Sequence, residues 1–336
     1  MVLNFQAVEG FFLVTDDDHI FEVKGVVHPK NRIVAYLRYL PAQDGNRVSS
    51  SGVRYRKITS LKERESYLQR KHSEYLWFDE TRGRLLQAVP LNRIAFALDP
   101  VDCLRQLRDI GRHSSSLQQA SLNLIQTLTD ITGIEWETIG LTGSQLVGLA
   151  SSESDIDLVI YGEEPARKVY SILKEQFHAI GDLGWYAGKP LDKHVTFRWG
   201  KNPRWRDVLR KVESDKVLQG LFSGYEFFIR MVKLPDEVGY EYDDFEIHNE
   251  GMLTVKCHVT DDHDSIFTPC AYGVQCNRLG NLRRLVSYRG RFTEQVSKGM
   301  NVEAKGRLES VTDRRSGEES SQLVLGENWD DYLVPL

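Results

Sequence analysis

The chain has 336 residues, of which 41% are hydrophobic and 27% charged, a composition that excludes disordered and fibrous classes and suits two or three globular domains. The formal net charge of -5 gives no general attraction to nucleic acid, so any such binding depends on local basic patches. No apolar run approaches the ~18 residues that span a bilayer, and the first residues lack the basic region of a secretory signal, so we expect a cytoplasmic protein.

Residues 1–97 are predicted to form a β-rich domain. The runs FFLV, HIFEVKGVV and RIVAYLRYL are rich in β-branched and aromatic residues, and Asp, Gly and Pro separate them. One charged helix is expected over SLKERESYLQRKHSEYL. These residues do not indicate what the domain recognises.

Residues 98–236 are predicted to form a central domain in which strands and helices alternate. Two helices are expected first, starting near Asp99 and Ser116. The next elements are a strand over EWETIGLTG, a short helix over SQLVGLA, a strand over SDIDLVIYG, a helix over PARKVYSILKEQFHAIG and a strand over YEFFIRMVKL. An acidic stretch, PDEVGYEYDDFEIHNEG, is expected to connect this domain to the last one.

Residues 245–336 are predicted to form a small β-barrel or sandwich. Short strands are expected over MLTVKCHV, CAYGVQC, LVSYRGRF, NVEAKGRLESV and SQLVLG. Turn residues separate them at the spacing typical of such folds.

Gly143 and Ser144 follow a predicted strand and begin the short helix. Unpaired backbone N–H groups and the helix dipole favour an anion at such a position. Glycine lets a phosphate approach closely, and the Ser144 hydroxyl adds a donor. An alternative is that Ser144 only caps the helix and Gly143 only forms the turn.

Asp155 and Asp157 lie two residues apart at the start of the next strand, so their side chains point to the same side. Their Cα atoms are expected to be roughly 7 Å apart, and the carboxylates can then converge on ions about 3.5–4 Å apart. Like charges this close repel one another, and bound Mg²⁺ relieves the repulsion. The alternative is the solvated end of a strand, where Asp is common.

Taken together, TGSQLVGLASSESDIDL resembles the nucleotidyltransferase signature of the DNA polymerase beta superfamily. With GVVHPKNRIVAYLRYLP, GYEFFIRMVKL and IFTPCAYGV, the whole chain resembles an archaeal group of predicted nucleotidyltransferases. The resemblance implies an α+β fold: a central nucleotidyltransferase-type mixed sheet with helices, flanked by the N-terminal β-rich domain and a small, OB-like C-terminal β-barrel.

The resemblance also implies a reaction. Gly143 and Ser144 would hold the phosphates of a nucleoside triphosphate, for which ATP is the expected choice. Asp155 and Asp157 would bind two Mg²⁺ ions while a nucleotidyl group passes to a hydroxyl acceptor and pyrophosphate leaves. Such proteins usually have a third carboxylate on a later strand, for which Glu226 is the candidate. The alternative is that Glu226 is only an exposed residue at the end of a strand.

Several basic residues are candidates for binding the substrates. Arg230 shares the strand face of Glu226 and could meet the triphosphate. Basic residues near Trp199 and Trp205, and others in the last domain, suit single-stranded nucleic acid. The predicted nucleic-acid-binding residues are Arg204, Arg206, Arg283, Arg284, Arg289 and Arg291.

The expected acceptor is therefore RNA, for which a tRNA-like molecule is the first choice. Two alternatives remain open. One is transfer to a protein or a small molecule, and the other is an inactive fold that serves as a nucleotide- or RNA-binding scaffold. The sequence does not indicate an oligomeric state.

Overall fold

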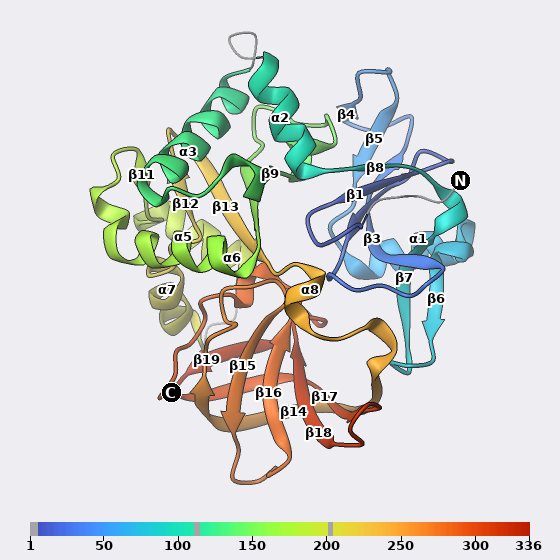
Figure 1. The fold of residues 1–336 in the computed structure, drawn as a ribbon, viewed down its shortest axis with the longest axis vertical. Helices are drawn as coiled ribbons and strands as arrows, with labels where there is room; N and C mark the ends of the chain where they lie inside the picture. The colour runs from blue at the N-terminus through green and yellow to red at the C-terminus, as the bar shows by residue number, and fades with distance from the viewer. Residues whose placement is uncertain (1–5, 111–114, 201–203) are drawn as a thin grey trace. The chain divides into compact units, whose positions relative to one another are not determined.

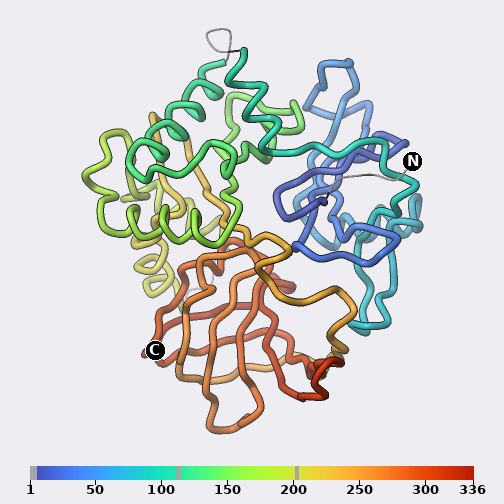
Figure 2. Tube along the Cα trace, in the orientation of Figure 1, coloured from blue at the N-terminus to red at the C-terminus, as the bar shows by residue number. Residues whose placement is uncertain are grey.

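The computed structural model describes residues 6–110, 115–200 and 204–336. Figures 1 and 2 trace the chain through its helices and strands. The described residues form two units, each with its own hydrophobic core. The first unit comprises the chain up to Asp79, Arg84–Glu175 and Phe222–Tyr242, and the second comprises Glu80–Gly83, Gln176–Leu221 and Asp243–Leu336. Each unit is thus assembled from segments that are distant in the sequence.

An 8-stranded antiparallel sheet forms the N-terminal part of the first unit. Its strands are β1 (Phe12–Thr15), β2 (Ile20–Val23), β3 (Arg32–Pro41), β4 (Arg47–Val48), β5 (Arg54–Lys57), β6 (Leu76–Asp79), β7 (Arg84–Pro90) and β8 (Ile94–Leu98). The order is β4-β5-β3-β2-β1-β8, and β7 pairs with β3 and β6. Helix α1 (Leu61–Lys71) begins where the Ser60 side chain accepts a hydrogen bond from the backbone N–H of Glu63. The expected strands are present, and the expected helix is present but shorter: it ends at Lys71, and Ser73–Tyr75 form a separate 3-10 turn.

A mixed sheet with helices forms the other part of the first unit. Its elements are α2 (Pro100–Ile110), α3 (Ser116–Thr132), β9 (Ile139–Leu141), α4 (Gly143–Leu146), β10 (Ile156–Tyr161), α5 (Glu163–Gln176), β13 (Tyr225–Val232) and α8 (Pro235–Val238). Strand β10 lies between β9, which is antiparallel to it, and β13, which is parallel to it. The mixed α+β class expected from the sequence is confirmed.

Local signals explain where the long helices begin and end. The Asp99 carboxylate accepts a hydrogen bond from the Val101 N–H at 2.8 Å, at the start of α2. Ser115 and Gln118 form a reciprocal capping box at the start of α3. That helix ends at Gly133, whose φ of 63° is a left-handed conformation that glycine adopts readily.

In chain order, the middle segment of the second unit contains the short strand β11 (Leu183–Gly184), the helices α6 (Gly188–Trp199) and α7 (Arg206–Ser214), and the short strand β12 (Gln219–Phe222). Its main sheet contains β14 (Phe245–Asp261), β15 (Cys270–Gln275), β16 (Leu282–Ser287), β17 (Asn301–Asp313), β18 (Glu319–Leu325) and β19 (Tyr332–Pro335). The order is β14-β15-β16-β18-β17-β19, and β14 also pairs with β17. The strands β14, β15, β16, β18 and β17 therefore form a closed ring of hydrogen-bonded pairs. Only the β16–β18 pair of this sheet is parallel among the described strands.

Strand β14 starts earlier than expected. The acidic stretch before Met252 was predicted to be a connector, but β14 already begins at Phe245, which pairs with Asp313 of β17. Pairing along the whole of β17 compensates for the weak strand propensity of these acidic residues.

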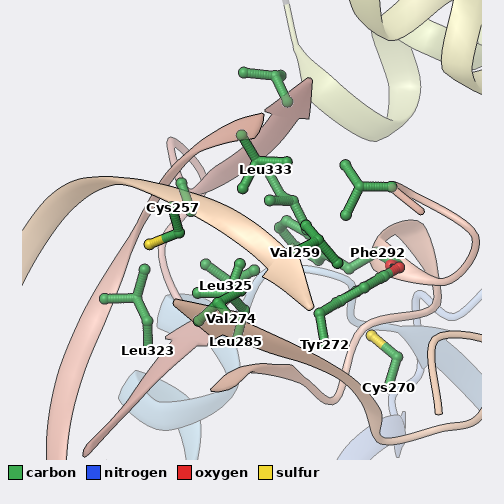
Figure 3. Close-up of a cluster of buried hydrophobic side chains, with 14 of the residues drawn as sticks. Cys257, Val259, Cys270, Tyr272, Val274, Leu285, Phe292, Leu323, Leu325 and Leu333 are labelled. Carbon is green, nitrogen blue, oxygen red and sulfur yellow. The ribbon is translucent and has the colours of Figure 1, made fainter. Parts of the chain in front are cut away.

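Apolar side chains of the second unit converge on one buried cluster (Figure 3). Cys257 and Cys270 lie in it beside Val259, Tyr272 and Leu285. All four cysteines of the chain are free. Within the described part of the chain, no helix combines the length and apolar character needed to cross a membrane.

Candidate active site

Gly143 lies directly against the side chain of Asp157. The backbone N–H of Thr142 donates a hydrogen bond to the Asp157 carbonyl at 2.9 Å, which holds the end of β9 against β10. Gly143 has a φ of +67°, and a Cβ added to it would lie 2.8 Å from Asp157 Cγ. The sequence needs glycine here both for the backbone conformation and for the close approach of the carboxylate.

The Ser144 hydroxyl is buried and has no hydrogen-bond partner among the described residues. It does not cap the helix: the N-cap of α4 is Thr142, whose own hydroxyl donates to the Gly10 carbonyl at 2.6 Å. The alternative in which Ser144 is only a cap is therefore wrong. A buried hydroxyl without a partner is costly, so a ligand that supplies one would be stabilised there.

The two aspartates stand at the start of β10, as predicted. Ile156, Leu158 and Ile160 are fully buried on the other side of the strand, Asp157 is half-buried, and Asp155 is exposed. Burial and the neighbouring charge of Asp155 raise the pKa of Asp157 to about 7. The pair therefore holds negative charge that a cation would stabilise.

The N-terminal sheet brings three cations to this region, and the sequence analysis missed all of them. Lys57 pairs with Tyr39 across β5 and β3, and Tyr39 packs in one cluster with Leu146 and Leu149, which follow the Gly-Ser segment. Lys57 is half-buried, and its ammonium group has neither a hydrogen bond nor an ion pair within the residues that the structure describes. Burial, together with the charge of Arg38, lowers its pKa.

Arg38 and Arg47 are the other two cations. Arg38 lies at an irregularity in the pairing of β2 with β3, which changes side-chain directions, and its Nε is 3.8 Å from a Glu22 carboxylate oxygen. Arg47 donates to the Leu149 carbonyl at 2.9 Å, directly after α4. The charges of Arg38 and Lys57 also act on Asp157, where they oppose the rise in its pKa. Cations that converge in this way favour an anionic ligand.

Arg230 has contacts other than those predicted. Its Nη1 lies 2.6 Å from Glu9 and 3.1 Å from Glu22, because both carboxylates are buried and need a counter-charge. Its charge also opposes the rise in the pKa of Asp157. The guanidinium is thus already bound on one side, and its contact with a triphosphate stays a prediction.

Glu226 is exposed on β13. The next residue, Phe227, pairs with Ile156, and Phe228 pairs with Asp157. Because the strands are parallel and side chains alternate, Glu226 is level with Asp155 on the side of the sheet that carries both aspartates. It therefore stays the candidate for a third carboxylate.

The six arginines predicted to bind nucleic acid are in the second unit and fall into three groups. Arg283 and Arg284 are exposed on β16. Arg204 pairs with Glu303 at 3.0 Å, and Arg206 lies 4.0 Å from Asp192.

Arg289 and Arg291 are different, because they bind the protein's own backbone. Arg289 Nε donates to the Gly326 carbonyl at 3.3 Å, and Arg291 Nη1 donates to the Arg198 carbonyl at 2.8 Å. The Arg291 guanidinium lies 4.9 Å from the Trp199 ring, which is 6% exposed and belongs to the core. Internal carbonyls thus take part of the donors of these two arginines, and their contact with nucleic acid stays a prediction.

Comparisons with known proteins identify relatives. Residues 133–217 match the family described as nucleotidyltransferase domain. An uncharacterized protein of Methanocaldococcus jannaschii is 27% identical over 340 residues, which cover 96% of this chain and 97% of that protein. The beta subunit of a ribonucleoside-diphosphate reductase of Mycoplasmoides gallisepticum is 28% identical over 159 residues, 44% of this chain and 46% of that subunit. No solved structure matches the chain.

Proposed function

Since the chain carries a domain of the nucleotidyltransferase family over residues 133–217, we propose that it is a Mg²⁺-dependent enzyme that transfers a nucleotidyl group from a nucleoside triphosphate, ATP first, to a hydroxyl of RNA. The observation that carries this proposal is the contact between Gly143 and the Asp157 carboxylate, next to a buried Ser144 hydroxyl that has no partner in the described chain. This contact brings the Gly-Ser pair and the Asp-x-Asp pair of the sequence signature together in space.

In the proposed reaction, the acceptor oxygen attacks the α-phosphorus of the triphosphate. The bond from that phosphorus to the oxygen bridging to the β-phosphate breaks, and pyrophosphate leaves. The proton of the acceptor hydroxyl passes to a carboxylate, a role for which Glu226 is the proposed residue.

Asp155 and Asp157 fit Mg²⁺ because carboxylate oxygens are the ligands that this ion takes in proteins. Burial and the charge of Asp155 raise the pKa of Asp157, and a cation would relieve the repulsion between the two carboxylates. When bound, Mg²⁺ supplies Lewis-acid stabilisation of the charge on the phosphate oxygens.

The phosphates themselves would be held by residues of both parts of the first unit. The Ser144 hydroxyl would donate one hydrogen bond, and Lys57 would add an ammonium group that has no ion-pair partner of its own among the described residues. Arg38 and Arg47 would orient the pyrophosphate portion, which becomes the leaving group.

For RNA, we propose a surface on the second unit. The ring of β14, β15, β16, β18 and β17 supports an OB-like barrel over residues 245–336, and the other two proposed domains are residues 1–97 and 98–236. OB-folds bind oligonucleotides on the face of their second and third strands, which correspond to β15 and β16 here. Arg283 and Arg284 are exposed on β16, so they are the first candidates for phosphate contacts.

Incubation with α-labelled ATP, Mg²⁺ and total cellular RNA tests the proposal. We expect label in RNA, and none with the Asp155→Asn plus Asp157→Asn variant, although this variant should fold. If the label appears in a protein band instead, the acceptor is a protein and not RNA. Absence of label from every acceptor, with unchanged nucleotide binding in the double variant, would indicate an inactive scaffold.

A further inference from the structure

A second group of metal-ligand side chains lies on the N-terminal sheet and shares no residue with the aspartate pair. Asp17 and His19 lie between β1 and the start of β2, and His72 directly follows helix α1. One ligand atom from each of the three lies within 4.8 Å of the others. We propose that Asp17, His19 and His72 bind one zinc ion, in a site that is independent of the nucleotidyltransferase reaction.

The spacing of the ligand atoms suits zinc. His19 Nδ1 lies 3.0 Å from Asp17 Oδ1, and His72 Nδ1 lies 3.2 Å from Asp17 Oδ2. In a tetrahedral site with bonds of about 2.0–2.1 Å, neighbouring ligand atoms are roughly 3.3 Å apart. Two imidazoles and one carboxylate form a donor set that zinc prefers over magnesium or calcium. Water, or Glu74 with an oxygen 3.7 Å from His72 Nδ1, is available for the fourth position.

His19 is only 2% exposed, and its Nδ1 faces a carboxylate oxygen of Asp17 at 3.0 Å. Its other ring nitrogen, Nε2, lies 2.8 Å from the Tyr67 hydroxyl. Metal-binding histidines characteristically make such a bond with the nitrogen that does not touch the ion, because it fixes the ring orientation.

The Asp17 carboxylate is held in place. Its Oδ1 accepts hydrogen bonds from the Thr15 hydroxyl and, at 2.9 Å, from the Tyr75 hydroxyl. Arg93 lies 3.1 Å from Asp17 Oδ2 and brings a positive charge near the site. Arg93 also pairs with Asp16 at 2.9 Å, so a second carboxylate shares that charge. The His19 and His72 rings are tilted with their centroids 4.3 Å apart, so both imidazoles lie beside the Asp17 carboxylate.

The test uses the full chain, freed of metal with a chelator and dialysed, with Zn²⁺ alone as the probe. Isothermal titration and elemental analysis are expected to give one zinc per chain. His72→Ala should remove this binding, and Tyr67→Phe, which keeps the ring but loses the hydrogen bond to His19, should weaken it at least ~10-fold. His248→Ala is the matched control, since this histidine is exposed on β14 and should leave zinc binding unchanged.

Two results would overturn the site: zinc binding by His72→Ala as tight as that of the unaltered chain, or no zinc bound by the unaltered chain. The Asp155→Asn plus Asp157→Asn variant separates this proposal from the nucleotidyltransferase site, because it should retain the zinc while it loses transfer activity. If His72→Ala does not fold, Co²⁺ in the unaltered chain decides instead. A strong visible absorption of tetrahedral Co²⁺ supports the site, and its absence overturns it.

Discussion

Gly143 and Asp157 are packed so closely that a side chain at position 143 would meet the Asp157 carboxylate, with its Cβ only 2.8 Å from Cγ. Gly148, five residues later, has nearly the same backbone φ, +66° compared with +67°, but an added Cβ there meets nothing within 4 Å. The two glycines therefore separate the effect of the backbone conformation from that of the close approach.

Gly143→Ala should abolish nucleotidyl transfer and lower the free energy of unfolding by about 1–3 kcal/mol beyond the backbone effect, because the new methyl group displaces Asp157. Gly148→Ala should keep activity and lower the free energy of unfolding by only about 1–2 kcal/mol, because alanine must adopt the left-handed backbone conformation there. Denaturant unfolding and labelled-ATP transfer measure both. Equal losses of activity in the two variants would show that the contact with Asp157 does not matter.

Lys57→Ala should raise the KM for the triphosphate by roughly 10- to 100-fold, because a hydrogen bond to a charged group contributes about 1.5–3 kcal/mol. Stability should hardly change, since Lys57 makes no ion pair with any described residue and lies near the like charge of Arg38. Arg56→Ala is the control on the same strand: its side chain alternates to the other side and lies 3.7 Å from Glu63. Steady-state kinetics on both variants decide whether the N-terminal sheet takes part in binding the triphosphate.

The stability of the metal-free protein should depend on pH through Asp157. The pKa of this carboxyl is raised in the folded state from 3.8 to about 7, so protonation stabilises the fold. Its contribution is fully present below pH 3.8 and is lost as the pH rises to about 7. In the presence of chelator, Asp157→Asn should therefore remove a fall in unfolding free energy between these pH values. Parallel curves for the two proteins would contradict the assignment.

The cysteines should react slowly in the folded protein. Burial raises the pKa of Cys257 and Cys270 to about 12 and that of Cys103 to about 11, so few thiolates are present at pH 8. Mass spectrometry after iodoacetamide treatment should show little alkylation of these three residues in the native chain and complete alkylation in denaturant. Rapid native alkylation of Cys257 or Cys270 would mean that the cluster in Figure 3 opens easily.

Arg283→Ala plus Arg284→Ala should weaken RNA binding and reduce the dependence of log affinity on log salt by about 2, since each arginine would neutralise one phosphate. Arg210→Ala is the control, because Arg210 lies on α7 and not on β16, and its guanidinium pairs with Asp192 at 3.0 Å. Filter binding over a range of salt concentrations measures the slope. An unchanged slope in the double variant would remove β16 from the proposed RNA surface.

Local patterns determined much of the aspartate site. The two-residue spacing of Asp155 and Asp157, with buried Ile156 and Leu158 on the opposite face, follows from side-chain alternation in any strand. The capping signals of α3 and the position of Gly143 before a short helix are likewise contained in a few neighbouring residues. These features could be predicted because neighbouring residues alone determine them.

Tertiary packing decided the rest. Lys57 and Arg38 precede the aspartates by about 100 residues in the printed sequence, and only the pairing of β3 with β5 and its packing on Leu146 and Leu149 bring that sheet to them. Arg230 shares the predicted strand face, but its strongest contacts are with Glu9 and Glu22, which a distant strand and loop supply. Side-chain periodicity specifies which way a residue points from its own strand, whereas its partners depend on which other segments are packed there. That packing is why sequence analysis found the carboxylates and missed the cations that face them.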